Sequence, residues 1–271
     1  MRCSWASAFG MMLLSVLAIS CAGGAQIAIP DGLTHEHIVA PGDHIEGRIR
    51  VSSTADVAVT VTVDLRDYLF FADGTTLYAD PGTVERSSSS WFELLTSEPI
   101  VVAPGDEATI VYTLDIPDDD RLRGTYWCIL LVGPATPASP AASPGLSITT
   151  VLNYGVQIVT HIGDSGTRSV RAVGTELTES DGEIVLSVDL ENDGERWVRP
   201  DVWAELYAED GTRLLRVESG RLRIYPGTSV RHRFGFGDLA PGTYRTVVLI
   251  DDQGTAAWAA QFALHVVEEA D

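Results

Sequence analysis

The stretch GTYWCILLV at residues 124–132 recurs as GTYRTVVLI at residues 242–250. Each copy lies downstream of a Pro-Gly turn that starts an alternating strand. A tyrosine two residues after a glycine, at the start of an apolar strand, is typical of a β-sandwich corner, where its hydroxyl bonds to backbone upstream. Because the setting occurs twice, the sequence predicts an all-β fold of two tandem immunoglobulin-like β-sandwich domains, with Tyr126 and Tyr244 in equivalent corners.

Short alternating segments separated by Gly, Pro, Asp and Asn fill the rest of the chain and predict further strands. We expect them at residues 26–29, 44–51, 57–68, 91–95, 100–102, 109–114, 183–190, 201–208, 213–217 and 257–267, with a hairpin turn at 73–74. A chain of 271 residues suits two domains. We place them at residues 26–162 and 169–271, with a hinge at 163–168.

The end of the predicted first domain combines a loop and a long strand. Residues 133–145 (GPATPASPAASPG) contain only Gly, Pro, Ala, Ser and Thr, which predicts an extended loop without a core. The strand expected at 146–161 follows, and its alternate positions are apolar apart from Thr150: Leu146, Ile148, Leu152, Tyr154, Val156 and Ile158. Such a strand either fills the core of its own domain or offers these side chains to a partner.

The N-terminus has the pattern of an export signal. A basic Arg2 precedes an apolar stretch at 10–20 that is too short to span a bilayer, and small residues follow. The string LAISC at 17–21 resembles a bacterial lipoprotein box, which predicts a signal peptide at 1–20 and lipidation of Cys21. The alternative is ordinary cleavage after Ala22 or Ala25. Either route predicts an exported protein of the periplasm or cell surface, and lipidation would anchor it to the outer membrane.

Cysteine usage leaves one thiol in the mature body, Cys128, because Cys3 lies in the signal and Cys21 is either lipidated or removed. Cys128 stands two residues after Tyr126, where an antibody-like domain has its second inter-sheet cysteine. It has no partner with which to form that disulfide. We therefore expect Cys128 to be buried and unpaired.

The formal net charge of −20 excludes nucleic acid as the main partner, because phosphate binding requires clustered cations. All 18 basic side chains are arginines. Several of them lie in the second half, and Arg221 and Arg223 alternate with apolar residues, so both should lie on one outer face. These arginines either pair with nearby carboxylates or form a face for an anionic envelope polymer or acidic partner, comprising Arg221, Arg223, Arg231 and Arg233.

Three histidines near the mature N-terminus, His35, His37 and His44, are candidates for a metal site. A strand would place His35 and His37 on the same face. No Cys or carboxylate is spaced as a further ligand, so we assign no metal and no cofactor. Residues 87–90 lack the nucleophile elbow of serine hydrolases. We assign no catalytic residue and predict a non-enzyme, with a metal-dependent hydrolase or metal-binding protein that uses the three histidines as the alternative.

A family resemblance rests on motifs in residues 26–161: Asp67-Tyr68, Asp73-Gly74, Tyr78, Pro81-Gly82-Thr83, Arg86-Ser87, Trp91, Pro104-Gly105, Ile116-Pro117 and Gly124-Thr125-Tyr126-Trp127. This set resembles the periplasmic fimbrial (PapD-like) chaperones and the WxL-interacting proteins of bacterial surfaces. The resemblance implies tandem immunoglobulin-like domains that act by binding. It also implies that Ile148, Leu152, Tyr154, Val156 and Ile158 are donated to a partner's sheet.

Fimbrial chaperones of this kind hold the terminal carboxylate of their subunit with an Arg and a Lys between the domains. This chain has no Lys, and the sequence identifies no first-domain Arg for that role. We predict a non-catalytic extracytoplasmic protein that assists assembly or anchoring of surface or secreted protein subunits through a strand or sheet edge. A passive structural envelope lipoprotein is a further alternative.

Overall fold

The first domain is a sandwich of two mainly antiparallel sheets. The computed structural model describes residues 26–135, 151–180 and 182–267. One sheet has the order β1 (Ile27–Ala28), β3 (His44–Ser53), β8 (Glu107–Asp115), β6 (Phe92–Leu94). The other has the order β2 (Thr34–Val39), β10 (Tyr154–Ile162), β9 (Gly124–Pro134), β4 (Val59–Phe70), β5 (Thr76–Ala79), with β7 (Ile100–Val102) on β4. The short helix η1 (Ser89–Trp91) precedes β6.

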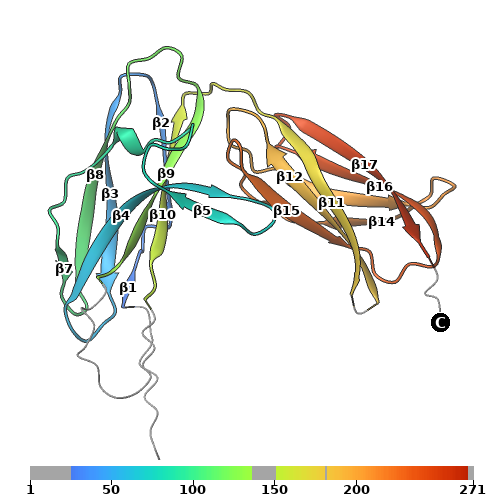
Figure 1. The fold of residues 1–271 in the computed structure, drawn as a ribbon, viewed down its shortest axis with the longest axis horizontal. Helices are drawn as coiled ribbons and strands as arrows, with labels where there is room; N and C mark the ends of the chain where they lie inside the picture. The colour runs from blue at the N-terminus through green and yellow to red at the C-terminus, as the bar shows by residue number, and fades with distance from the viewer. Residues whose placement is uncertain (1–25, 136–150, 181, 268–271) are drawn as a thin grey trace, which may run out of the picture.

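The second domain is also a sandwich of two antiparallel sheets. One contains β11 (Val170–Ser180), β12 (Glu183–Asn192) and β15 (Ser229–Gly235). The other contains, in order, β14 (Arg213–Glu218), β13 (Asp201–Tyr207), β16 (Gly242–Asp251) and β17 (Ala257–Val266). Within the described ranges, no helix is long and apolar enough to cross a membrane. The prediction of an all-β fold with two tandem sandwiches is confirmed (Figure 1).

The two sequence repeats form equivalent strands, β9 and β16. Each lies between the last strand of its domain and an earlier one, β10 and β4 in the first domain and β17 and β13 in the second. Alternation along β9 places Cys128, Leu130 and Val132 in the first core with no exposed surface. Cys128 is unpaired, as predicted, and burial raises the pKa of its thiol to about 12.

The tyrosine corner is confirmed in the second domain and wrong in the first. The Tyr244 hydroxyl donates to the carbonyl oxygen of Ala240 at 2.7 Å. Tyr126 instead packs its ring against Trp91, with centroids 4.7 Å apart, and lies under the guanidinium of Arg86. In the part of the chain described, the Tyr126 hydroxyl has no hydrogen-bond partner. The start of β9 is bonded both to its upstream loop, where Trp127 N donates to Arg86 O at 3.1 Å, and to the second domain through Thr125.

That junction joins the two sandwiches, whose long axes meet at a steep angle in Figure 1. The amide of Thr125 donates to Glu195 O at 2.9 Å, and Trp197 N donates to Thr125 Oγ1 at 3.1 Å. The ring of Trp127, from β9, stacks on Tyr225 of the second domain at 4.7 Å between centroids. Both rings are almost fully buried. The domains therefore share a packed interface of their own.

The segment predicted as a hinge lies beside this interface. Arg196 donates from Nη1 to the carbonyl oxygens of Gly163 and Ser165, at 3.0 and 3.2 Å. The hydroxyl of Ser165 accepts from Gly124 N at 3.1 Å. The β4–β5 hairpin, whose turn at 73–74 was predicted, also reaches the second domain, since Ala72 N donates to Ser229 Oγ at 3.0 Å. The hinge at 163–168 remains a prediction.

Candidate partner-binding site

The second-domain side of the interface is built by two short segments that pair antiparallel. Val198 and Ile224 exchange both backbone hydrogen bonds, at 3.1 and 2.9 Å, and their side chains have no exposed surface. Side chains alternate along extended backbone. The residues next to them, Trp197, Arg199, Arg223 and Tyr225, therefore point the other way. Their side chains face the first domain.

Arg223 is the most enclosed of these cations. Its guanidinium carbon lies 4.3 Å from the centroid of Trp197, and the group is ion-paired to Glu36 on β2. It also donates to the Tyr225 hydroxyl at 3.3 Å, which in turn donates to Gln157 Oε1 at 2.5 Å. Burial of Glu36 opposes its charge, but the hydrogen bond and charge of Arg223 outweigh it and hold the pKa of Glu36 below its ordinary value.

His161 on β10 completes this network from the first domain. Its ring stacks on Trp197 at 5.7 Å between centroids, and Nδ1 lies 3.1 Å from Thr125 Oγ1. Nε2 lies 3.5 Å from Glu36 Oε2. Burial lowers the pKa of His161 more than the nearby Glu36 raises it. His161 is therefore a neutral packing residue of the interface at pH 7.

Two further arginines open onto the groove beside Arg223. Arg221 donates from Nε and Nη2 to the carbonyl oxygen of Arg199, at 3.3 and 3.1 Å, and its Nε lies 3.4 Å from Asp201. The side chain of Arg199 is exposed, and among the described residues no carboxylate pairs with it. The groove therefore contains one unneutralised guanidinium in a chain of formal net charge −20.

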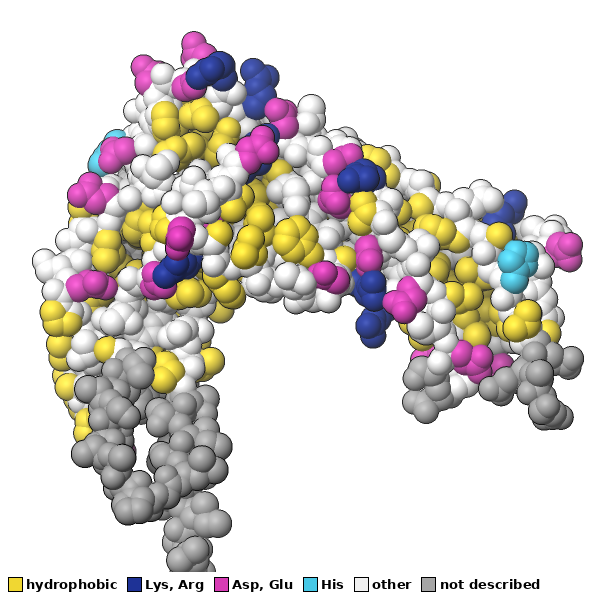
Figure 2. Space-filling model, viewed as in Figure 1, with side chains coloured by type: hydrophobic (Ala, Val, Ile, Leu, Met, Phe, Trp, Pro, Cys, Tyr) yellow, Lys and Arg dark blue, Asp and Glu magenta, His cyan; other side chains and the backbone are white. Residues whose placement is uncertain are grey.

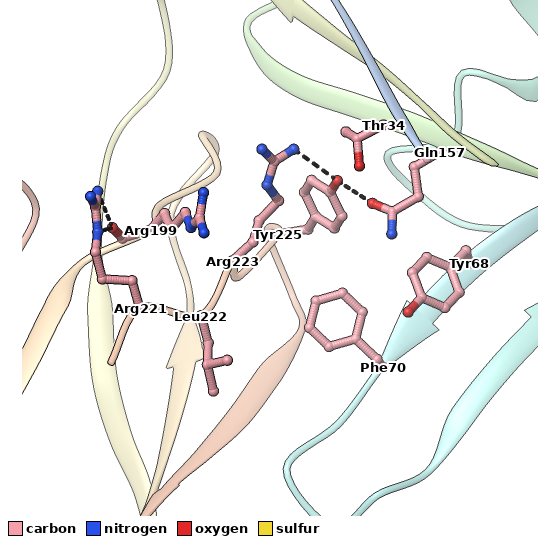
Figure 3. A pocket seen from close by; sticks show the side chains of 9 residues that line it. All are labelled: Thr34, Tyr68, Phe70, Gln157, Arg199, Arg221, Leu222, Arg223 and Tyr225. Carbon is pink, nitrogen blue, oxygen red and sulfur yellow. Dashed lines mark hydrogen bonds between the residues drawn. The ribbon is translucent and has the colours of Figure 1, made fainter. Parts of the chain in front are cut away.

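Figure 3 shows the resulting cavity of about 370 Å³ between the domains. The three arginines and Leu222 form one wall, and Thr34, Tyr68, Phe70 and Gln157 of the first domain form the other. The first-domain rings belong to a continuous aromatic row: Tyr68 stacks on Tyr78 at 5.6 Å, and Phe70 meets Tyr225 edge-on at 6.0 Å. The arrangement combines cations with flat apolar surface.

Asp67 fixes the strand from which these rings project. Its buried carboxylate accepts from the hydroxyls of Ser87 and Ser89, at 2.5 and 2.6 Å, and from the amides of Thr83 and Val84. Burial works to raise the pKa of Asp67, but these hydrogen bonds outweigh it and hold the pKa below its ordinary value. The carboxylate is thus fully occupied in tying the 83–89 loop to β4.

The edge of β10 is open next to the groove. β2 pairs in parallel with β10 from Thr34 opposite Gln157 to Val39 opposite Ile162. Among the described strands, none pairs with Tyr154, Gly155 or Val156 on that side. Because Gln157 N donates on this side, to Leu33 O, backbone alternation leaves the N–H and C=O of Gly155 facing the open side, where an additional strand could pair with them. Such a strand would end where β2 begins, at the mouth of the cavity.

The residues predicted to be donated to a partner fall into three environments. Ile148 lies outside the described residues, as do Cys21 and the signal peptide. Val156 and Ile158 have no exposed surface and lie in the core of the first domain. Tyr154 is half-buried, and its hydroxyl donates to Ile27 O at 2.9 Å. Leu152 precedes β10 and is 52% exposed.

The predicted strand at 146–161 is shorter in the structure, since residues 151–153 are described but are not in a strand. Within the described part of this predicted strand, Leu152 therefore supplies the exposed side chain and Gly155 the open backbone groups. Contact with a partner through the side chains of Val156 or Ile158 would require the sandwich to open.

The four arginines predicted to share one face are divided between two places. Arg221 and Arg223 line the groove. Arg231 lies on β15, where it is ion-paired with Asp189 at 2.7 Å and Glu176 at 3.0 Å. Arg233 follows on the same strand and is exposed. On the face drawn in Figure 2, basic side chains occur in small groups between acidic and hydrophobic ones.

The three histidines are not brought together, because β2 and β3 belong to opposite sheets. His37 contacts the buried Tyr112 hydroxyl at 3.0 Å, while His44 pairs with Asp115 at 2.6 Å. His35 is on the same side of β2 as His37, as predicted, and its Nε2 is buried without a partner. In the part of the chain that the structure describes, no group of three or more His, Cys, Asp or Glu is placed to hold a metal.

Sequence reasoning missed Arg199, Trp197 and Tyr225. The available signal was the repeated alternation in RWVR at 196–199 and RLRIY at 221–225. Pairing these two strings through their buried Val198 and Ile224 would have placed the missing residues beside Arg223. That pairing is a long-range contact, which periodicity alone does not identify.

No protein-family model matches the sequence, and no curated protein matches it. Several solved structures do match it. A chain of the chaperone–tip adhesin complex for CFA/I fimbriae biogenesis aligns over 88% of this chain and 98% of its own, with 9% identity and a TM-score of 0.48. The class 5 fimbriae chaperone CfaA aligns over 87% and 98%, with 11% identity and a TM-score of 0.45.

The Salmonella enterica complex of the SafA pilin with the SafB chaperone gives 90% and 98% coverage, 11% identity and a TM-score of 0.41. The chain is thus similar in fold, over most of its length, to chaperones of fimbrial assembly.

Proposed function

We propose that the protein is a non-catalytic, exported binding protein that holds an extended segment of another surface or secreted protein during assembly or anchoring. The observation that carries the proposal is the open edge of β10 beside Gly155, which adjoins a groove lined by Arg199, whose side chain pairs with no carboxylate among the described residues. Main-chain hydrogen bonds to the edge would supply affinity. The exposed Leu152 and the half-buried ring of Tyr154 would supply apolar contact.

The groove determines which end of the segment is recognised. A strand that pairs with the β10 edge ends at Gln157, because β2 occupies the edge beyond that residue. If the added strand runs parallel to β10, its carboxyl end lies beside Arg199 and Arg221. A terminal carboxylate is the group that a guanidinium fork binds best. In this proposal the second domain supplies all the arginines that line the groove.

The test is recovery of the partner from native membranes by the tagged wild-type protein, followed by mass spectrometry. Leu152→Glu should abolish recovery, because it places a charge on the proposed contact. Leu214→Glu is the matched control, since Leu214 is 48% exposed on β14 and does not line the groove. Equal recovery by both variants would contradict pairing at the β10 edge.

Arg199→Glu tests the groove separately. It should weaken binding of the recovered partner at least about tenfold, which corresponds to about 1.4 kcal/mol, the lower end of a charge-assisted hydrogen bond. The same loss should follow when the partner's terminal carboxylate is converted to an amide. If Arg199→Glu weakens binding while the amide does not, the groove binds an acidic side chain instead. Membrane attachment through Cys21 is a further proposal, which the mass of the mature protein would test.

A further inference from the structure

The strand β17 ends the four-stranded sheet of the second domain. It pairs with β16 from Ala257 opposite Asp251 to Val266 opposite Gly242, without a register shift. The strand order β14-β13-β16-β17 leaves its other side without a described neighbour in the sheet. This outer edge therefore presents unpaired backbone groups along a strand of 10 residues.

Natural edge strands usually carry features that prevent pairing, such as charges, prolines, bulges or short length. The edge strand β14 contains Arg213, Arg216 and Glu218, and the edge strand β11 has a register shift between Ala172 and Gly174. The sequence of β17, AWAAQFALHV, contains no Asp, Glu, Lys, Arg or Pro. It is a long, regular and uncharged edge in a chain of formal net charge −20.

The side chains of β17 alternate between two environments. Its odd-numbered residues are exposed on the outer face: Ala257, Ala259, Gln261, Ala263 and His265. Its even-numbered residues pack toward the core, but Trp258 and Phe262 remain only partly buried at this open edge. A strand added there would cover the exposed parts of both rings, which is favourable in proportion to the apolar area removed from water.

We propose that the β17 edge pairs antiparallel with β17 of a second copy of this chain, around a two-fold axis that is perpendicular to the sheet and passes midway between the two Gln261 residues. A two-fold axis in this direction brings inner faces together and outer faces together. On the inner face, Trp258 then lies opposite Leu264 of the second copy, and Phe262 lies opposite Ala260 of the second copy. Each of the larger rings faces a smaller side chain.

The outer face is equally self-complementary. Ala259 lies opposite Ala263 of the second copy, and Gln261 lies opposite itself, where two amides can exchange hydrogen bonds. No like charges meet along residues 257–265. An identical strand thus pairs with the open backbone groups, sets each large side chain opposite a smaller one, and brings no like charges together. Because the copies repel one another through their net charge, the dimer should strengthen as salt increases.

Cysteine cross-linking tests the register. Gln261→Cys places a thiol directly opposite its copy, at a Cβ separation close to that of a disulfide. Ala257→Cys is the control, because Ala257 lies opposite His265 of the second copy and its two thiols are then far apart. Cys128 is buried in both variants. Mild oxidation of the mature protein should give a covalent dimer with Gln261→Cys and almost none with Ala257→Cys.

Sedimentation equilibrium tests the contact without a covalent bond. The double variant A259E/A263E opposes like charges twice and should weaken dimerisation about tenfold, whereas A259E/A263R opposes unlike charges and should restore it. Circular dichroism should show the same fold in both, since both positions are exposed. The proposal is overturned if the wild type stays monomeric up to its solubility limit, if the two double variants dimerise equally, or if the two cysteine variants cross-link equally.

Discussion

Replacing Gly124 with alanine should separate the cost of strained backbone from the cost of a damaged domain interface. Gly124 has a φ of 81°, and an alanine Cβ there would lie 2.0 Å from the carbonyl oxygen of Glu195. That oxygen accepts the hydrogen bond from Thr125 N at 2.9 Å. The substitution therefore imposes left-handed backbone on an L-residue and forces Glu195, with its hydrogen bond, away from the first domain.

The left-handed backbone costs about 1–2 kcal/mol, and the broken hydrogen bond costs about 1 kcal/mol. Loosening of the Trp127–Tyr225 stack adds about 1 kcal/mol. We therefore expect Gly124→Ala to lose about 3–4 kcal/mol of unfolding free energy in urea titrations, which is a large fraction of a typical domain's stability.

Gly105→Ala is the control for backbone strain alone. Gly105 has a φ of 73°, and no atom lies within 4 Å of its built Cβ. It should lose only about 1–2 kcal/mol. The fluorescence of the interface tryptophans should change in Gly124→Ala but not in Gly105→Ala. Equal losses in the two variants, with unchanged fluorescence, would refute the interface described above.

Two further predictions concern single side chains. Tyr244→Phe should lower the free energy of unfolding by about 1 kcal/mol through its lost hydrogen bond to Ala240, and Tyr126→Phe should lower it clearly less. Thermal unfolding that shows the reverse order would contradict the corner assignment. Burial lowers the pKa of His232 to about 4, so the unfolded chain takes up its proton near pH 6.5 while the folded domain does not. The folded state is therefore favoured by the neutral His232 above pH 6.5, and this contribution to the free energy of unfolding is lost as the pH falls toward 4. From about pH 7.5 to about pH 5, the wild type should lose about 2 kcal/mol more than His232→Gln in urea titrations, and equal losses would contradict a neutral buried imidazole.

Local pattern was sufficient to predict most of the strands. The alternation of valines at 57–65 predicted β4, and the strand at 100–102 was predicted with the bounds of β7. Gly124 and Gly242 correctly marked the starts of β9 and β16. These features follow from period-two burial and turn chemistry, which nearby residues determine.

The interface and the groove could not be predicted in the same way. Tyr126 has the corner motif, yet its environment depends on Trp91 and on the second domain bonded to β9. Arg199 gains its role only because Val198 pairs with Ile224, a contact between distant segments. Likewise, only the parallel pairing of β2 shows which part of β10 is covered.

The central claim is that an extended segment of a partner protein lies along the open edge of β10, and cross-linking in intact cells tests it most directly. A photoreactive amino acid at Leu152 should give a cross-link to one defined protein, through a peptide near the carboxyl terminus of that protein. Arg199→Glu in the same chain should remove most of this cross-link. The same photoreactive residue at Leu214, on β14, should give none to that protein. No cross-link at position 152, or equal cross-links at 152 and 214, would contradict the account.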